Sequence, residues 1–567
     1  MSSAWAIDLG TTNTAIARWD ASAYRPRLLE LPNVCRRPGG EDHLEAPRLI
    51  PSSTQIIADP TIMDRLGAWP PIAKRFFVGQ QALIGRPALE QNEGVTRPNF
   101  VPTFKPYLTR EALKPIAKAG GKGFSARDVT RLFVRELFAE VKRETGERIR
   151  DLAVTTPVES FESYRAEILT LMKRLGVKRV RFIDEPVAAA IGYGLNIGKD
   201  RLVLVVDFGG GTLDIALVGL SAKEVQGGQG RVIAKEGRDL GGRTVDRWLL
   251  EEFCKILDQP VRDDSDEDDV FWNRLMLVEA CRVKEAVYFR DKDTFTLIRP
   301  DELGNFEAKM RGRDGSSLEV SREMVAEILE RRGLLKELDD CLSKLFEDAK
   351  ARGVDERDID DVLMVGGSTL LPGIYPMFEK RFGRDRVRAW QPFEAVAYGA
   401  CAFASESFTQ SDFIVHDYAF TTYNAKTHEK EYTIVVPRGT RFPTNSDFWK
   451  RQLVPTCSLG EEETLFKLVI SEIGRSIDDE RRFAWDEKGN LHKIGGRGGE
   501  PGKPLVVPLN ESNPTLGYLK PPHQPNDRRP RLEISFGVNQ DRWLFATVYD
   551  LKTKKLLMKE EPVVRLL

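Results

Sequence analysis

The sequence has few cysteines and no long apolar run. Its 567 residues include only six cysteines, which are scattered and form no C-x-x-C pair. That spacing argues against a disulfide framework, so we expect buried, reduced thiols and a cytoplasmic location. The longest plainly apolar strand, 202–206, is far too short to cross a bilayer. The first residues lack a basic region followed by an apolar core, so we expect no secretory signal.

The chain also lacks an excess of charge of either sign. It has 85 Lys and Arg against 86 Asp and Glu, which gives a formal net charge of −1. A chain without a net positive field does not attract nucleic acid or an anionic membrane electrostatically, so we predict neither as a partner. With 41% apolar and 30% charged residues, the composition excludes a disordered or collagen-like chain. At about 100–200 residues per domain, the length indicates several domains.

The most informative pattern is an approximate internal repeat. Residues 6–17 read AIDLGTTNTAIA, and residues 205–216 read VVDFGGGTLDIA. Each copy has an apolar strand, an aspartate, a Gly/Thr turn and a second apolar strand, which predicts a tight hairpin with exposed N–H groups. Asp8 and Asp207 lie 199 positions apart, so a duplicated unit would end a little past residue 400.

Within those 400 residues, strands alternate with amphipathic helices, which indicates α/β layers. Ser125 is typical of a helix N-cap, with Asp128 three residues on. The apolar residues that follow share one helical face: Val129, Leu132, Phe133, Leu137 and Val141. We predict buried strands at 152–155 and 362–365.

After residue 418 the pattern changes to strands alone. The candidates are 432–436, 465–470, 532–538 and 544–549, separated by Gly, Pro and Asn clusters. This spacing predicts a small all-β unit.

The two Gly/Thr turns have the chemistry of a phosphate site. A triphosphate needs many N–H donors, little side-chain bulk and cations that spread its charge. Two facing hairpins would hold a phosphate tail from both sides, and Asp8 and Asp207 would hold a hydrated Mg²⁺. One such turn is weak support, but two in register within a duplicated frame favour phosphate binding.

At this point a family resemblance is visible. The hairpins, together with EPVAAAIGYG at 185–194, VGGST at 365–369 and QPFEAVAYGA at 391–400, resemble the actin/sugar-kinase/heat-shock ATPase superfamily. More specifically, they are similar to the seventy-kilodalton heat-shock (DnaK) chaperones. DFIVHD at 412–417 resembles that family's interdomain linker, and segments 432–444 and 516–519 look like parts of its peptide-binding sandwich.

The resemblance implies an α/β fold with an actin-like, two-lobed ATPase domain built on a duplicated unit, followed by an all-β sandwich. It places the nucleotide-binding domain at 1–408, the linker at 409–417 and a peptide-binding-like sandwich at 418–567. The implied cofactors are ATP or ADP and Mg²⁺, with K⁺ as a further ion.

Carried over residue by residue, the resemblance implies four catalytic residues. Glu185 would act on the attacking water, Lys105 would orient that water, and Thr212 would offer the hydroxyl nearest the γ-phosphate; Asp207 is the fourth. Asp8 and Asp207 would hold the metal through water. Without the resemblance, Glu185 would be an acid at a helix start and Lys105 a surface lysine.

The same resemblance implies which residues bind the nucleotide and which two residues transmit the nucleotide state to the linker. The cofactor-binding residues would be Gly10, Thr11, Thr12, Asn13, Gly209, Gly210, Gly211, Thr212, Gly241, Gly242, Lys284, Tyr288, Gly366, Gly367 and Ser368. Pro157 and Arg165 match the pair that relays the nucleotide state toward the linker; alone, Pro157 would be only a strand terminator.

The chain departs from the family pattern mainly around the base. Glu285 and Leu370 stand where two arginines clamp adenine, and Tyr288 replaces a serine, so that its ring could serve as a stacking surface. Phe393 and Arg243 stand where acids are usual. Each lost cation–π contact would remove roughly 1–2 kcal/mol, or about tenfold in affinity. We therefore expect that the residues that bind the phosphates are intact and that the binding of the base is weakened or achieved by other residues.

The resemblance implies an ATPase acting as a molecular chaperone in protein folding and the stress response. Its partners would be unfolded or extended polypeptide, a J-domain co-chaperone and a nucleotide-exchange factor. The family continues into a helical lid whereas this sequence stops at Leu567, so we expect a groove that releases peptide quickly. One alternative is a nucleotide-sensing regulator or scaffold with little turnover. Another, disfavoured by the 185–190 motif and the trailing β unit, is a small-molecule kinase.

Overall fold

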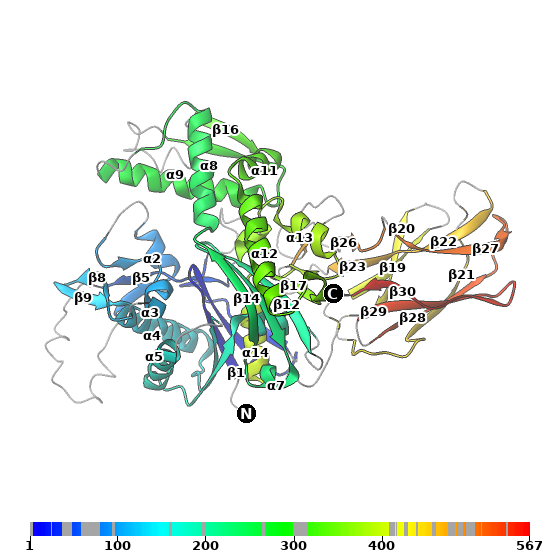
Figure 1. Cartoon of the computed structure of the whole chain (residues 1–567), viewed down its shortest axis with the longest axis horizontal. Coiled ribbons are helices and arrows are strands. Elements are labelled where there is room, and N and C mark those ends of the chain that lie inside the picture. The colour runs from blue at the N-terminus through cyan, green and yellow to red at the C-terminus, as the bar shows by residue number, and fades with distance from the viewer. Residues whose placement is uncertain are drawn as a thin grey trace. The chain divides into compact units, whose positions relative to one another are not determined.

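The computed structural model gives the chain two compact units (Figure 1). The first comprises residues 1–381 and 392–409, and the second comprises 382–391 and 410–567. The structure describes residues 4–23, 25–36, 48–57, 80–92, 97–110, 112–157, 162–195, 200–262, 267–298, 316–406, 414, 417–424, 429–437, 440–455, 457, 461–474, 482–485, 491–494, 505–511, 513–539 and 542–566.

The first unit contains two similar sheets, one in each lobe. In the first lobe, β1 (Ala4–Leu9) pairs antiparallel with β2 (Asn13–Asp20) and parallel with β10 (Asp151–Thr156). In the second lobe, β12 (Arg201–Phe208) pairs antiparallel with β13 (Leu213–Leu220) and parallel with β17 (Asp361–Val365). The repeated sequence therefore forms a repeated hairpin whose first strand also has a parallel partner. The duplicated α/β fold is confirmed.

The remaining strands of the first unit extend these sheets or form small ones. The first sheet continues through β11 (Arg179–Asp184), β3 (Arg25–Leu28) and β4 (Ile50–Pro51), and the second through β14 (Arg231–Arg238). The small sheets contain β5 (Thr54–Ile56), β6 (Ala82–Ile84), β7 (Phe100–Val101), β8 (Pro115–Ala119), β9 (Lys122–Ser125), β15 (Lys292–Leu297) and β16 (Ser316–Ser321).

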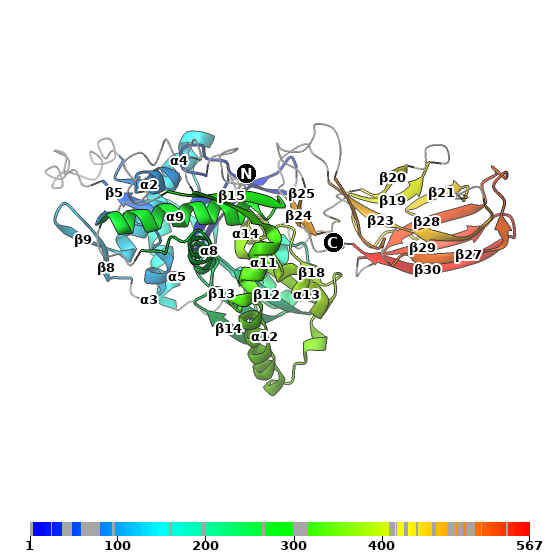
Figure 2. The same cartoon turned by 90° about the horizontal axis from the view of Figure 1, so that it is seen from above.

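Helices surround both sheets. They are α2 (Arg86–Glu90), α3 (Lys105–Arg110), α4 (Ala126–Thr145), α5 (Glu162–Arg174), α6 (Glu185–Gly192), α7 (Ala222–Gln226), α8 (Gly242–Ile256), α9 (Glu267–Ala286), α11 (Arg322–Arg331), α12 (Leu334–Ala351), α13 (Ile374–Phe382) and α14 (Ala395–Ala404), with short 3₁₀ turns at Glu356–Asp358 and Gly367–Leu370. In Figure 1 the blue and cyan elements α2–α5 gather on one side of the sheets. In Figure 1 and Figure 2, α8 lies beside α9.

The predicted helix after Ser125 is confirmed as α4. The Ser125 side chain accepts a hydrogen bond from the Asp128 amide, and the Asp128 side chain bonds back to the Ser125 amide, which forms a capping box. The predicted apolar residues Val129, Leu132, Phe133, Leu137 and Val141 are all buried in the core of the first lobe.

Two small-residue helices, α6 and α14, cross closely in the first unit. A Cβ built on Gly192 would lie 1.8 Å from the Ala395 carbonyl oxygen, and one built on Gly399 would lie 1.7 Å from that of Ala188. Neither position has room for a side chain. This contact explains why both motifs are rich in Ala and Gly, and it holds α6, which begins with Glu185, in place.

The second unit is a β-sandwich. One sheet has the order β20 (Lys430–Val436), β19 (Asp417–Tyr423), β23 (Ile470–Gly474) and β26 (Leu505–Pro508). The other has the order β21 (Trp449–Leu453), β28 (Leu532–Val538), β29 (Trp543–Asp550) and β30 (Lys555–Arg565). Phe420 and Phe536, from the two sheets, pack with ring centroids 5.6 Å apart. The all-β prediction is confirmed.

Shorter strands complete this unit, and one prediction about them is wrong. Residues 465–470 were expected to form one strand, but β22 (Glu463–Leu468) ends before β23 begins at Ile470. The first pairs with β27 (Thr515–His523) and the second with β19, so the chain changes partners there. The remaining strands here are β24 (Arg482–Trp485), paired with β25 (Leu491–Ile494). The short strand β18 (Val387–Arg388) is instead an edge strand of the sheet with the order β14-β13-β12-β17-β18.

The domain boundaries at 408 and 418 stay predictions. Of the predicted linker, only Ile414 and Asp417 belong to the described residues; 409–413 and 415–416 lie outside them. Across the described part of the chain, no helix is both long and apolar enough to span a membrane. All six cysteines are free thiols, and four of them are buried.

Candidate functional site

The two Gly/Thr turns meet. A Cβ built on Gly210 would lie 2.6 Å from the Thr12 hydroxyl oxygen, and one built on Gly211 would lie 3.9 Å from the Thr11 methyl group. At Gly10, a Cβ would lie 2.2 Å from the carbonyl oxygen of Asn13, so that turn also requires glycine. The hairpins of the two lobes therefore face each other at close range, and the place where they meet is called the gap below.

In the first turn, the backbone carbonyl groups accept hydrogen bonds from residues of the first lobe. The Ser52 hydroxyl donates to the Gly10 carbonyl at 2.8 Å, and the Ser52 amide donates to that of Thr12 at 2.9 Å. The Thr103 hydroxyl donates to the Thr11 carbonyl at 2.7 Å. Because these carbonyls point into the first lobe, the turn presents its other side to the gap.

The second turn is held in the same way by the start of α8. The amides of Gly242 and Arg243 donate to the carbonyls of Gly209 at 3.1 Å and Gly210 at 3.0 Å. The hydroxyl of Ser368 donates to the Gly209 carbonyl at 2.9 Å. A Cβ on Gly241 would lie 2.6 Å from the Gly211 amide nitrogen, so only glycine allows this approach.

The amide groups of the turns are left for a ligand. Among the described residues, the amides of Thr11, Thr12, Gly210 and Gly211 donate no hydrogen bond, and the buried Thr12 hydroxyl has no partner. Convergent backbone N–H groups form an anion-binding concavity. The arrangement can therefore hold a phosphate chain between the lobes.

An ion pair lies beside this gap. Lys105 is the first residue of α3 and Glu185 the first of α6, and the Lys105 Nζ atom lies 2.8 Å from Glu185 Oε1. Burial alone would lower the pKa of Lys105, but the charges of Glu185, Tyr164 and Asp8 raise it above its ordinary value. Lys105 therefore stays a cation. Both side chains keep some exposure, 13% and 21%, so they remain within reach of a ligand.

The two hairpin aspartates belong to the same electrostatic cluster. Burial raises the pKa of Asp8, whose carboxylate accepts a hydrogen bond from Thr155 at 2.6 Å. Burial, followed by the charges of Glu185 and Asp214, raises the pKa of Asp207 to about 8. Crowded carboxylates raise one another's pKa values, and a cation placed among them reverses that effect.

This donor set fits a hydrated Mg²⁺. The described residues contain no cluster of three or more His, Cys, Asp or Glu side chains that could enclose a metal ion. Mg²⁺ keeps several waters and usually takes one or two carboxylates together with substrate phosphates. Asp8 and Asp207, next to two phosphate-binding turns, offer that number of ligands. The exposed Thr212 lies at the end of the second turn.

The predicted relay residue Arg165 contacts the start of α6. Its guanidinium lies 2.7 Å from a carboxylate oxygen of Asp184, the residue that precedes Glu185. Pro157 directly follows β10, and Arg165 also reaches the hydroxyl of Thr156, the last residue of that strand, at 3.4 Å. These contacts join α5 to the end of β10 and to the residue that precedes Glu185.

The predicted base-binding residues are largely covered by the protein itself. Lys284 forms a buried 2.7 Å ion pair with Asp246. Tyr288 and Leu370 are each only 3% exposed. Stacking by Tyr288 stays a prediction, and it requires the ring to become exposed. The Lys284 ammonium does reach the start of α8, at 3.5 Å from a Cβ built on Gly242.

The third glycine motif is also tightly packed. Gly366 has φ of +87°, a conformation that favours glycine, and its added Cβ would lie 2.4 Å from the Phe208 carbonyl. A Cβ on Gly367 would lie 2.6 Å from the ring of Phe393, which stands where the family has an acid. An aromatic ring thus covers this turn.

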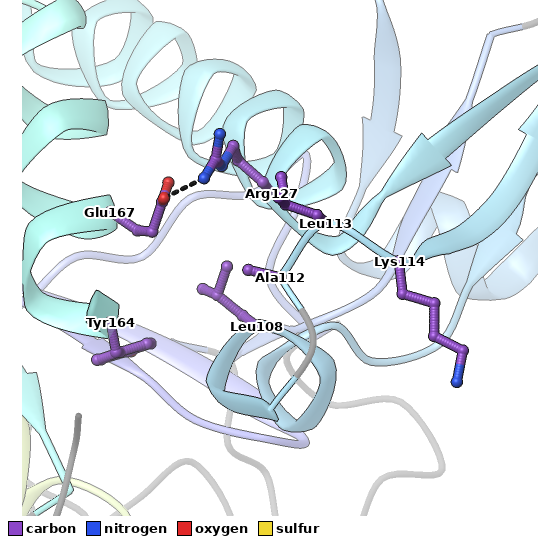
Figure 3. A pocket seen from close by; sticks show the side chains of 7 residues that line it. All are labelled: Leu108, Ala112, Leu113, Lys114, Arg127, Tyr164 and Glu167. Carbon is purple, nitrogen blue, oxygen red and sulfur yellow. Dashed lines mark hydrogen bonds and ion pairs between the residues drawn. The ribbon is translucent and has the colours of Figure 1, made fainter. Parts of the chain in front are cut away.

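A separate cavity of about 490 Å³ lies next to α3 (Figure 3). It is lined by Leu108, Ala112, Leu113, Lys114, Arg127, Tyr164 and Glu167, and Figure 3 shows the ion pair between Arg127 and Glu167 at its edge. None of the predicted site residues lines it.

Sequence reasoning missed several residues that shape the gap. Ser52 and Thr103 support the first turn, but nothing near them in the sequence signals this role. Thr155 could have been found, since it lies near the carboxyl end of a parallel strand, where ligand sites of α/β sheets gather. Asp246 follows Gly242 by one helical turn, and its pairing with Lys284 depends on the packing of α8 against α9.

Comparisons with known proteins agree with the resemblance. A family model described as Hsp70 protein matches residues 102–472. Chaperone protein DnaK of Thermus thermophilus is 26% identical over 459 residues, which covers 78% of this chain and 67% of that protein. A heat shock protein of Pyricularia oryzae is 29% identical over 333 residues, covering 57% of this chain and 51% of that protein.

A further relative is a ribosome-associated molecular chaperone of Zygosaccharomyces rouxii. It is 29% identical over 335 residues, again 57% of this chain and 51% of that protein. The chain thus spans about half the length of the Pyricularia and Zygosaccharomyces relatives and about two thirds of DnaK.

Proposed function

The chain belongs to the Hsp70 family, and from this premise we propose that it is an ATP-dependent chaperone that couples nucleotide hydrolysis to the binding of extended polypeptide. The observation that carries the proposal is the meeting of the two turns beside the Lys105–Glu185 pair. A phosphate chain held between the turns would lie within reach of one cation and one carboxylate.

The proposed chemistry is hydrolysis of ATP: water attacks the terminal phosphorus, the bond between that phosphorus and the bridging oxygen breaks, and ADP and inorganic phosphate are released. The carboxylate of Glu185 accepts the proton of the attacking water, while the Lys105 ammonium orients that water and offsets the charge that develops in the transition state. The turn amides and the Thr212 hydroxyl bind the phosphate oxygens. Mg²⁺ held through water by Asp8 and Asp207 would neutralise phosphate charge when bound.

The ionisation states support these roles. Lys105 stays protonated, as an electrostatic stabiliser must. Asp207, with a pKa of about 8 without ligand, would release a proton when a cation binds beside it. Nucleotide affinity should therefore depend on pH.

We place nucleotide binding in residues 1–408 and polypeptide binding in residues 418–567, joined by the linker at 409–417. Two-state coupling needs an element whose position depends on the nucleotide. The contacts among Thr156, Arg165 and Asp184 supply a path to Glu185, which supports the relay role of Arg165 and, next to Thr156, of Pro157.

The sandwich offers exposed apolar side chains to an extended peptide. Leu516 and Tyr518 alternate along β27, so they lie on one face, and they are 43% and 63% exposed. Extended peptides bind through main-chain hydrogen bonds and through pockets for alternate side chains.

We propose J-domain and nucleotide-exchange proteins as partners and a reducing, cytoplasmic compartment, which the free thiols support.

The catalytic assignment is tested by single-turnover ATP hydrolysis. Lys105→Ala and Glu185→Gln should each lower the rate by about 10²–10³-fold while Mg-ATP remains bound in calorimetry. Lys114→Ala is the control, because this exposed lysine lines the separate cavity. If either site variant hydrolyses ATP at the wild-type rate, the assignment is wrong.

Peptide binding is tested on β27. Leu516→Asp should weaken the binding of a fluorescent unfolded polypeptide, and Leu556→Asp should not, because that exposed leucine lies on β30, in a sheet that does not contain β27. Equal affinity of both variants for the polypeptide would contradict this surface.

One observation favours a second function, a nucleotide-sensing regulator with little turnover. The base-binding residues Tyr288 and Leu370 are buried, and Lys284 is engaged by Asp246. Slow hydrolysis that no polypeptide accelerates would support this function over the chaperone.

A further inference from the structure

Arg243 lies at the gap between the turns. It is the second residue of α8, and its side chain is exposed. Its Nη2 atom would lie 2.9 Å from a Cβ built on Gly211, and the same Cβ would lie 3.9 Å from the methyl group of Thr11. The guanidinium is therefore beside the second turn, where that turn comes close to the first.

The position is unfavourable for a cation in the absence of an anion. The first turn of a helix carries a partial positive charge, which disfavours Arg and Lys and favours acids. The first turn of α8 contains no acidic residue, and its cap has no side-chain hydrogen bond. Among the described residues the Arg243 side chain forms no ion pair or hydrogen bond. Nothing within the described fold accounts for a guanidinium here, whereas an anionic ligand would.

We propose that Arg243 binds the terminal phosphate of a nucleoside triphosphate as a second cation alongside Lys105. This inference rests on the proposed function. Gly211 immediately precedes Thr212, the hydroxyl that we place nearest the terminal phosphate, so the guanidinium lies on that side of the chain of phosphates. A planar guanidinium can donate two parallel hydrogen bonds to phosphate oxygens, a geometry that lysine does not match.

The consequence is selectivity for the number of phosphates. A contact to the terminal phosphate contributes to the affinity for a triphosphate and not to that for a diphosphate. Because Leu370 and Glu285 replace two base-clamping arginines, a larger share of nucleotide affinity would come from the phosphates. The site should then bind inorganic tripolyphosphate as well, and should discriminate little between ATP and GTP.

Calorimetry on the full chain tests this role with Mg-ATP, Mg-ADP, Mg-GTP and Mg-tripolyphosphate. Arg243→Gln should weaken ATP, GTP and tripolyphosphate by about tenfold or more and ADP by less than about twofold. Arg243→Glu should weaken the triphosphates further, and Arg243→Lys should recover part of the loss. Arg247→Gln is the matched control, since this exposed arginine lies one turn further along α8. Melting temperatures verify that each variant folds.

Two results would overturn the role of Arg243. One is an Arg243→Gln variant that binds ATP as the wild type does. The other is equal weakening of ATP and ADP, since the contact would then not be to the terminal phosphate. If the wild type binds no nucleotide and no tripolyphosphate, the proposed function itself is wrong and the inference falls with it.

Discussion

The contact between the turns predicts that Gly210→Ala disables nucleotide binding although the residue has ordinary backbone geometry. The new Cβ would lie 2.6 Å from the Thr12 hydroxyl oxygen, whereas an ordinary contact begins near 3.4 Å, so one side must move by about 0.8 Å. Either Thr12 turns away or the hairpins separate. Either movement displaces the turn amides from their places around the ligand, because in the proposed site the two turns bind one ligand together.

The size of the expected loss follows from how precisely the turns must position the nucleotide. A misplacement of about 1 Å at a reacting centre can cost about 10²-fold in rate. We therefore expect a rise of about tenfold to a hundredfold in the Kd for Mg-ATP, measured by calorimetry, and a similar loss in single-turnover hydrolysis.

The neighbouring glycine supplies the control. A Cβ on Gly209 would meet nothing closer than 3.8 Å, so Gly209→Ala should bind Mg-ATP within about twofold of the wild type. Thr12→Ala removes the atom that collides with the new methyl group. The Thr12→Ala/Gly210→Ala double variant should therefore lose less affinity than the two single losses combined. If Gly210→Ala binds as tightly as Gly209→Ala, the turns do not meet and the site is wrong.

The remaining predictions concern pH and stability. The pKa of Asp207 is near 8 in the folded, ligand-free chain against an ordinary value of 3.8, so the native state keeps a proton that the unfolded state loses. Stability should therefore fall as pH rises from about 4 to 8, and Asp207→Asn should flatten that slope in urea unfolding. Since Mg²⁺ requires the carboxylate, Mg-ATP affinity should rise over the same range, with proton release visible as a buffer-dependent heat. Ser125→Ala removes the α4 cap and should cost about 1 kcal/mol of unfolding free energy, whereas Leu137→Ala, fully buried, should cost about 2–5 kcal/mol.

Local sequence determined the hairpins and the first-lobe helix well. The order apolar strand, Asp, Gly/Thr turn, apolar strand specifies a hairpin by itself, and Ser125 with Asp128 specifies a helix start. These features depend on residues close together in the chain. The split of 465–470 into β22 and β23 was not predictable in this way, because the choice of strand partners depends on segments far away in sequence.

What the sequence alone determined is a duplicated α/β unit with two Gly/Thr hairpin turns, followed by an all-β unit, because periodicity and turn chemistry are local properties. Only the tertiary structure decided that Gly210 meets Thr12, that Ser52 and Ser368 hold the turn carbonyls from behind, and that Tyr288 is buried. It also decided that the Arg243 guanidinium lies beside Gly211. These contacts join residues tens to hundreds of positions apart, so they arise from tertiary packing: between the lobes for Gly210 with Thr12, and within one lobe for the contacts of Ser52, Ser368 and Arg243.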